Sequence, residues 1–209
     1  MKFLAWHLGL GDAIICAGLV SRLAKDQTII VPCYEHNYVS VKSFFNGLNV
    51  LIETVKSDRD VIELVNKYDA IRLGYFRNQN MNTDFVTQFY NDAEIDYEER
   101  YDSCPLLEAS HDVGQVEGSK KTLVCNSSSG GVYKINGISK EYMIPYSVGS
   151  ILAWRQAITN ADEIHCIDSA MLHLVEQLAG PKTKLFYHKY ARPNSPNFNF
   201  KNNWNVLTK

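Results

Sequence analysis

Short apolar runs alternate with segments of helical periodicity along most of this 209-residue chain. The first apolar run, residues 3–6, predicts a buried strand, and residues 13–25 carry apolar side chains at helical spacing. A second β-rich run at residues 28–31 is expected to stop at Pro32. A strand, a helix and a strand in this order form a βαβ unit, and such units build parallel sheets with right-handed crossovers.

The alternation continues in two series. We expect helices over residues 39–45, 58–67 (capped by Ser57 or Asp58) and 83–91, and strands over residues 50–55 and 69–73. Residues 92–118 are acidic and lack sustained periodicity. A second series follows, with strands at 122–125, 163–167, 183–187 and 204–207 and helices at 147–159 and 169–178. The sequence predicts an α/β fold of two small Rossmann-like lobes facing a cleft, residues 1–115 and residues 116–209.

Composition narrows the class of protein further. Hydrophobic residues make up 45% and charged residues 21%, which is typical of a globular core with a solvated surface. The formal net charge is −2, whereas proteins that hold duplex nucleic acid through its phosphates usually carry a basic surplus. Five widely spaced cysteines without a C-x-x-C motif favour reduced thiols over disulfides or structural zinc. Without a membrane span or a signal-peptide pattern, the expected location is the cytoplasm.

A glycine-containing loop follows the first predicted strand. It contains His7, Gly9, Gly11 and Asp12, and it leads directly into the first predicted helix. Glycines let the backbone turn sharply and approach a ligand, but the third glycine of a dinucleotide fingerprint is missing, and a carboxylate would repel a pyrophosphate. Asp12 is therefore a candidate general base for an acceptor hydroxyl. The alternative is an N-cap of the helix, and the two roles are compatible.

Two further segments carry candidate ligand contacts. Beyond the strand at 122–125, the hydroxyls of Ser127 and Ser128 with the downstream lysines Lys134 and Lys140 suit a diphosphate, although an ordinary surface loop has the same composition. A basic segment at 188–192 follows the strand at 183–187, where a phosphate contact or a solvated loop is expected.

The strand at 163–167 leads into a third candidate segment. It ends at Asp168, Ser169 is placed to cap the next helix, and His173 lies one turn along that helix. Ligands of open α/β sheets bind at such strand ends, whereas a lone histidine is more often a hydrogen-bonded core residue. His165, inside the strand, is assigned only a structural role. The spacing of His165, Asp168 and His173 matches no metal site.

The first and third segments together resemble the ADP-heptose:lipopolysaccharide heptosyltransferases and their wider glycosyltransferase relatives, over about a quarter of the chain. Those proteins carry a Gly-Asp loop between a strand and a helix, and a C-terminal Asp-(Ser/Thr)-Gly-x-x-His-Leu-Ala pattern before Leu-Gly-x-Pro and a strand ending Leu-Phe. The corresponding residues here are Gly11-Asp12-Ala13-Ile14, Asp168-Ser169-Ala170-Met171-Leu172-His173-Leu174-Val175, Leu178-Ala179-Gly180-Pro181 and Leu185-Phe186. The chain departs from the pattern at Ala170, which replaces a glycine, and at His7, which replaces a small hydroxyl residue.

The resemblance implies a GT-B fold with an acceptor-side N-terminal lobe, a nucleotide-sugar-side C-terminal lobe, and neither a metal nor a cofactor. Asp12 would be the catalytic base beside the acceptor-side loop of His7, Gly9 and Gly11. The donor-binding residues would be Ser127, Ser128, Lys134, Asp168, Ser169 and His173. The expected activity is transfer of a sugar from a nucleoside diphosphate sugar to a hydroxyl acceptor.

Three other functions stay open. The first is a non-catalytic module that binds a nucleotide or a phosphorylated molecule, and the second, weaker one is a nucleotide-dependent oxidoreductase. The third is a glycosyltransferase with nucleic acid as its acceptor, for which the charge balance offers no support.

Overall fold

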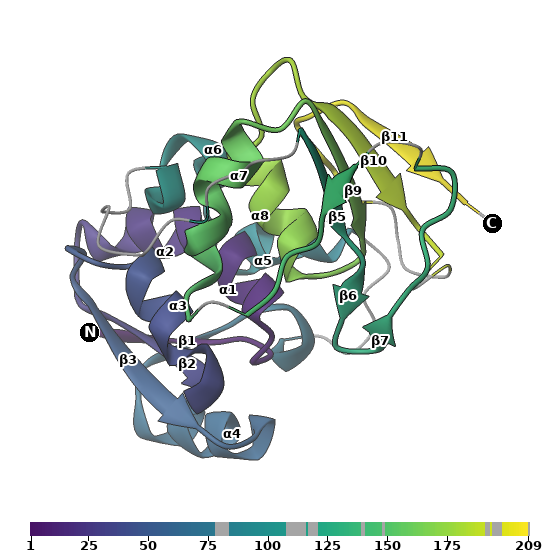
Figure 1. The fold of residues 1–209 in the computed structure, drawn as a ribbon. Helices are drawn as coiled ribbons and strands as arrows, with labels where there is room; N and C mark the ends of the chain where they lie inside the picture. The colour runs from purple at the N-terminus through teal and green to yellow at the C-terminus, as the bar shows by residue number, and fades with distance from the viewer. Residues whose placement is uncertain are drawn as a thin grey trace. The chain divides into compact units, whose positions relative to one another are not determined.

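The computed structural model describes residues 1–77, 84–107, 116, 121–138, 141–147, 149–190, 193 and 198–208. The chain divides into two compact units (Figure 1). The first comprises Met1–Ser110 with Pro196–Asn199, and the second His111–Ser195 with Phe200–Lys209. Each unit contains a parallel sheet with helices packed on it, which confirms the predicted α/β class with two Rossmann-like units.

The first unit is built on a four-stranded sheet with the strand order β3-β2-β1-β4. All of its pairings are parallel. Its strands are β1 (Lys2–Ala5), β2 (Ile29–Tyr34), β3 (Val50–Val55) and β4 (Ala70–Arg72). Its helices are α1 (Leu10–Ile15), α2 (Ala17–Ala24), α3 (Tyr38–Phe44), α4 (Asp58–Lys67), α5 (Phe85–Asp92) and α6 (Glu99–Asp102).

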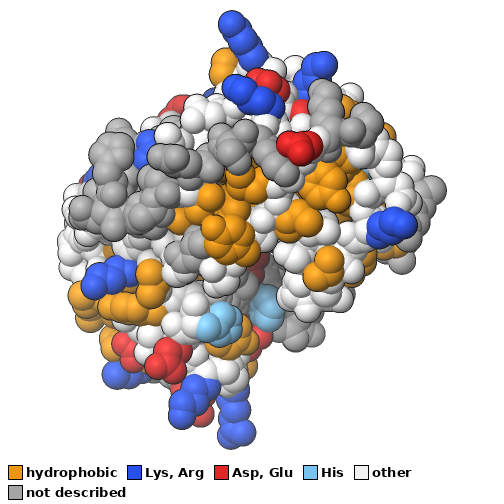
Figure 2. Space-filling view, viewed as in Figure 1, with side chains coloured by type: hydrophobic (Ala, Val, Ile, Leu, Met, Phe, Trp, Pro, Cys, Tyr) orange, Lys and Arg blue, Asp and Glu red, His pale blue; other side chains and the backbone are white. Residues whose placement is uncertain are grey.

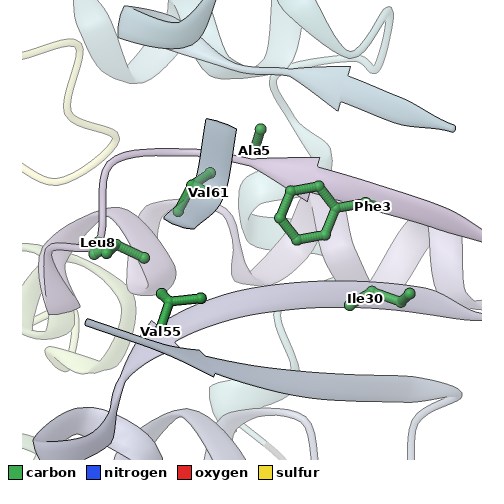
Figure 3. Close-up of a cluster of buried hydrophobic side chains, with 6 residues drawn as sticks. All are labelled: Phe3, Ala5, Leu8, Ile30, Val55 and Val61. Atoms are coloured by element: carbon green, nitrogen blue, oxygen red, sulfur yellow. The ribbon is translucent and has the colours of Figure 1, made fainter. Parts of the chain in front are cut away.

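The strand order determines which face of this sheet each helix covers. The chain moves from β1 to β2 and β3 in one direction, then returns past β1 to form β4. Because crossovers between parallel strands are right-handed, this reversal places α4 on the face opposite to α2 and α3. Figure 3 shows the α4 side of the sheet, where Val61 of α4 meets apolar side chains of the strands and of the loop after β1. The six buried residues of this cluster are Phe3, Ala5, Leu8, Ile30, Val55 and Val61.

The second unit contains a five-stranded parallel sheet with the order β11-β10-β9-β5-β8. Helix α8 packs on β9 and against α7. The strands are β5 (Thr122–Cys125), β8 (Tyr142–Met143), β9 (Glu163–Ile167), β10 (Lys184–His188) and β11 (Trp204–Leu207), and a separate two-stranded sheet pairs β6 (Ser127–Ser128) with β7 (Gly131–Val132). The helices are α7 (Arg155–Thr159), which follows a 3₁₀ turn at Ile151–Trp154, and α8 (Ala170–Leu178).

A buried carboxylate attaches the C-terminal segment to this unit. Glu176 of α8 is 2% exposed. Its oxygens accept hydrogen bonds from the main-chain N–H of Lys201 (2.7 Å), from Asn202 and from the indole Nε1 of Trp204 (2.7 Å). A buried carboxylate is stable only when it is satisfied in this way, so Glu176 directs the chain into β11.

The structure corrects four sequence-based expectations. The helix expected at 147–159 begins only with the 3₁₀ turn at Ile151–Trp154, and its α-helical part is α7. The helix expected at 13–25 is two helices, α1 and α2, which meet at Cys16. Strand β2 does not stop at Pro32 but continues to Tyr34. Beyond Ile30 its only described strand neighbour is β3, so Pro32 lies where one side of the strand is unpaired. Proline is tolerated at such edge positions. The polar loop after β5 is the β6–β7 hairpin, in which Gly131 has a φ of 119° that favours glycine.

Candidate functional site

In the first unit, the candidate residues follow the strand beside the topological switch point. The order β3-β2-β1-β4 reverses between β1 and β4, and ligands of open α/β sheets bind outside the carboxyl ends of the strands at such a point. The loop from His7 to Gly11 leaves β1 at that edge. The fold therefore brings the acceptor-side candidates to a place where such sheets bind ligands.

Asp12 lies in the first turn of α1 rather than at its N-cap. Gly9 holds the cap position, and the Asp12 carboxylate folds back over it, so that a Cβ added to Gly9 would lie 3.2 Å from Asp12 Oδ2. The alternative role of Asp12 as the N-cap of this helix is therefore wrong, because Gly9 is the N-cap. The partial positive charge at a helix N-terminus favours the ionised form of a first-turn carboxylate. Asp12 is half-buried, as are Gly9 and Gly11.

His7 pairs with a residue that sequence reasoning treated only as a possible helix cap. Its Nδ1 lies 2.8 Å from Asp58 Oδ2. Asp58 is the first residue of α4, where Ser57 is the N-cap and Asp60 accepts the main-chain N–H groups of Lys56 (2.8 Å) and Ser57 (3.2 Å).

The His7 side chain is 59% exposed. If the Asp58 carboxylate accepts the Nδ1 proton, the outer nitrogen Nε2 is left to accept another, as in other His–Asp pairs. In the sequence, the one indication that Asp58 could belong to the site is its position just after the predicted strand at residues 50–55.

In the second unit, two candidate segments follow neighbouring strands. The chain passes from β5 to β8 on one side and then to β9 on the other, so the switch point lies between β5 and β9. Cys125 and Cys166 are register partners near the ends of these strands. The structure therefore brings the segment beginning at Ser127 and the segment beginning at Asp168 to one sheet edge.

The β6–β7 hairpin orders the first of these segments. The Ser128 hydroxyl accepts the Gly130 N–H (3.1 Å), which closes the turn, while Ser127 is exposed. Lys134 follows the hairpin, and its carbonyl accepts the Tyr190 hydroxyl (3.1 Å) from the segment after β10. The Lys134 side chain is exposed and forms no ion pair within the described part of the chain. Lys140 and Arg192 lie outside the described residues.

At the start of α8, the Ser169 side chain does not cap the helix. Its hydroxyl donates to the Ile167 carbonyl (3.3 Å), so no serine oxygen covers the N–H groups of the first turn. Unfilled N–H groups at a helix N-terminus attract anions. Asp168 beside them is 5% exposed and His173 is 3% exposed. The burial of His173 favours the core role over direct contact with a ligand.

A chain of polar groups, in which both histidines are buried, crosses β9 and β10. Glu163 Oε1 lies 3.0 Å from His165 Nε2, and His165 Nδ1 lies 2.9 Å from His188 Nε2. Burial, and secondarily the neighbouring His165, lower the pKa of His188 from 6.5 to about 4. His188 is therefore neutral near pH 7 and adds no positive charge to the segment at 188–192. Within the described residues, no cluster of His, Cys, Asp and Glu could hold a metal ion.

The depressed pKa of His188 predicts a pH-dependent loss of stability. The unfolded chain takes up this proton at a higher pH than the folded one, so the contribution is complete above about pH 6.5 and falls as the pH drops toward 4. The loss should be at most about 3 kcal/mol. Urea unfolding between pH 7.5 and 4.5 measures it, with His188→Gln as the comparison. Parallel pH profiles for both proteins would contradict this assignment.

No family model matches the sequence, and no curated protein matches it significantly. Among solved structures, the chain resembles the crystal structure of the glycosyl transferase family 9 from Veillonella parvula DSM 2008. The TM-score is 0.58 at 10% sequence identity, and the match covers 100% of this chain and 85% of that chain. At this identity the likeness shows the fold, which is the pair of Rossmann-like units found in GT-B glycosyltransferases.

The surface and the helices add two observations. Lysine and arginine side chains are dispersed over the face drawn in Figure 2, where no large basic patch is visible. No helix in the described ranges has the length and apolar character needed to cross a bilayer.

Proposed function

We propose that this protein is a metal-independent glycosyltransferase related to the heptosyltransferases, which moves a sugar from a nucleoside diphosphate sugar to a hydroxyl group. One observation carries the proposal: Asp12 lies at the carboxyl end of β1, beside the switch point of its sheet, in a chain whose full length matches the glycosyl transferase family 9 fold. The Gly11-Asp12 and Asp168-to-Leu174 motifs support the same reading.

The first unit would receive the acceptor and activate it. Asp12 would accept the proton of the acceptor hydroxyl as the hydroxyl oxygen attacks the anomeric carbon of the donor sugar. Its place in the first turn of α1 puts the carboxylate at the positive end of the helix dipole. The exposed His7, oriented by Asp58, is the other group in this loop that could act as the base.

The second unit would bind the donor and stabilise the leaving diphosphate. The N–H groups at the start of α8, which the Ser169 side chain does not cap, suit the developing negative charge. The exposed Lys134 and Ser127 lie on the segment that leaves the neighbouring strand β5. Asp168 and Ser169 would shape this strand end. Ala170 places a methyl group at the first helical position, where the resembling family has glycine, which suggests a donor other than ADP-heptose.

A panel of nucleoside diphosphates and their sugars tests the donor site. The melting temperature is measured against ligand concentration, since a ligand that binds only the folded chain stabilises it by RT ln(1 + [L]/Kd). We expect one nucleotide sugar to raise the midpoint selectively, and Lys134→Gln to weaken that shift. Arg155→Gln, on α7 in the same unit, is the matched control.

The same panel separates a transferase from a non-catalytic binding module. A nucleotide sugar that binds and is then consumed in the presence of hydroxyl acceptors supports a transferase. Binding without turnover against any acceptor favours the non-catalytic module. The absence of binding by every nucleotide would contradict both functions.

A further inference from the structure

The first unit contains an open pocket at β4, the outer strand of its described sheet, and none of the residues assigned to transfer lines it. Its volume is about 410 Å³, within the range of small-molecule sites. It is bounded by strand β4 and by the end of α5, and its lining residues are Ala70, Ile71, Arg72, Arg77, Asp92, Ala93 and Glu94.

One arginine of this pocket is held in place by a buried carboxylate. Asp92 has a side chain only 2% exposed, and it accepts the Gly74 N–H (2.7 Å) and the Gln88 amide (2.6 Å). Arg77 Nη1 donates to the Asp92 main-chain oxygen (2.6 Å), and its Nε lies 3.5 Å from Asp92 Oδ1. The Arg77 side chain is 52% exposed, so its remaining N–H groups stay available. This guanidinium is oriented before any ligand arrives.

A second arginine lines the same pocket. Arg72 ends β4, is exposed, and forms no ion pair or side-chain hydrogen bond within the described part of the chain. Two guanidinium groups around one pocket suit a phosphate or a carboxylate, because their paired N–H donors match the geometry of these anions.

The wall of the pocket also offers uncharged hydrogen-bonding groups. The main-chain groups of Asp69 and Leu73 point toward β1. The Phe3 N–H donates to the Asp69 carbonyl (3.0 Å), and the Leu73 N–H donates to the Ala5 carbonyl (2.8 Å). Main-chain groups alternate in direction along a strand, so those of Ala70 and Arg72 point outward. In the described part of the sheet, β4 has no strand neighbour on that side.

Glu94 completes the lining. It follows α5 with a φ of 57°, a left-handed conformation in which glycine is the usual residue. Its carboxylate is an acceptor for a hydroxyl or amino donor of a bound molecule. The pocket thus combines two cations, one carboxylate and an open strand edge.

We propose that this pocket binds a small organic anion that also carries hydroxyl groups. Its phosphate or carboxylate oxygens accept hydrogen bonds from Arg72 and Arg77, and its hydroxyls bond to Glu94 and to the outward main-chain groups of β4. The pocket uses none of the residues assigned to the donor or to the base.

Calorimetric titration of the full chain with four probes tests the proposal. Glycerol 3-phosphate and glycerate carry the two anionic groups, glycerol carries only hydroxyls, and inorganic phosphate carries only the anion. We expect at least one of the two organic anions to bind, more tightly than inorganic phosphate, and glycerol to show no binding. Which of them binds more tightly distinguishes a phosphate ester from a carboxylic acid as the natural ligand.

Three variants assign the binding to this pocket. Arg72→Gln and Arg77→Gln should each weaken it at least about tenfold, the loss expected for a hydrogen bond to a charged group. Arg59→Gln, on α4 with an 87% exposed side chain, is the matched control and should change nothing. Since Arg77→Gln could disturb the Asp92 network, Arg72→Gln is the decisive variant. Unchanged binding by Arg72→Gln, or no binding of either organic anion to the unmodified protein, would overturn the proposal.

Discussion

Replacing Asp12 with asparagine is expected to lower the rate of sugar transfer by at least about a hundredfold, the usual contribution of a general base. Asparagine has almost the same shape as aspartate but cannot accept the acceptor's proton. The Asp12 carboxylate packs over Gly9, since a Cβ added to Gly9 would lie 3.2 Å from Asp12 Oδ2. Asparagine at position 12 fills the same space, so the loop should stay intact. The measurement is kcat and KM with the donor found by the nucleotide-sugar panel. Donor-induced stabilisation should remain nearly unchanged.

The His7–Asp58 pair supplies the comparison that makes this test specific. His7→Gln removes the other candidate base in the same loop, and Asp58→Asn removes the carboxylate that orients it. If Asp12 is the base, His7→Gln should lower kcat far less than Asp12→Asn does. Near-normal turnover by Asp12→Asn together with loss of turnover by both His7→Gln and Asp58→Asn would transfer the role to the histidine.

Replacing Gly18 with alanine is expected to give a large loss of stability. Gly18 is a buried residue of α2, and a Cβ added to it would lie 2.1 Å from the main-chain oxygen of Glu99 and 2.8 Å from the Cα of Arg100. Alanine normally gains about 1 kcal/mol over glycine inside a helix. Here the new methyl group meets backbone atoms, so α2 and the segment at α6 must separate, and overpacking of this kind costs about 1–3 kcal/mol or more. We expect the cost to exceed the gain.

Urea unfolding measures this effect through the midpoint of the transition. Gly180→Ala is the matched control, because the nearest atom to its added Cβ is Thr183 Oγ1 at 3.6 Å, an ordinary contact. Equal midpoints for the two variants would show that α2 does not pack on the α6 segment as closely as the structure indicates.

Much of the fold was predictable because the secondary structure follows local patterns. The apolar runs and helical periodicities locate the strands of both sheets and most of their helices, within a few residues of the observed bounds. The errors occur where a distant contact decides the conformation. The break between α1 and α2 is one such place, since Tyr90, far along the chain, donates to the Ile15 carbonyl (2.8 Å) at that point.

The sequence predicted the individual residues of the candidate site but not which segments lie next to one another. The sequence indicates that Asp12 and Asp168 each follow a strand, and parallel strands place their carboxyl ends at one edge of a sheet. Strand order is a tertiary property, so only the structure shows that the segments after β5 and β9 are neighbours and that the reversal lies between β1 and β4. The burial of His173 and the neutral state of His188 likewise depend on packing, which alters solvation.

The sequence by itself therefore determined the alternation of strands and helices, the two-series organisation and the chemical types at the strand ends, because these depend on residues close together in the chain. Only the tertiary structure decided that Asp58 meets His7, that Glu176 holds the C-terminal segment, and that Arg72 and Arg77 share a pocket. Each of these contacts joins side chains from different elements. Their meeting depends on strand order and helix packing, which local sequence patterns do not encode.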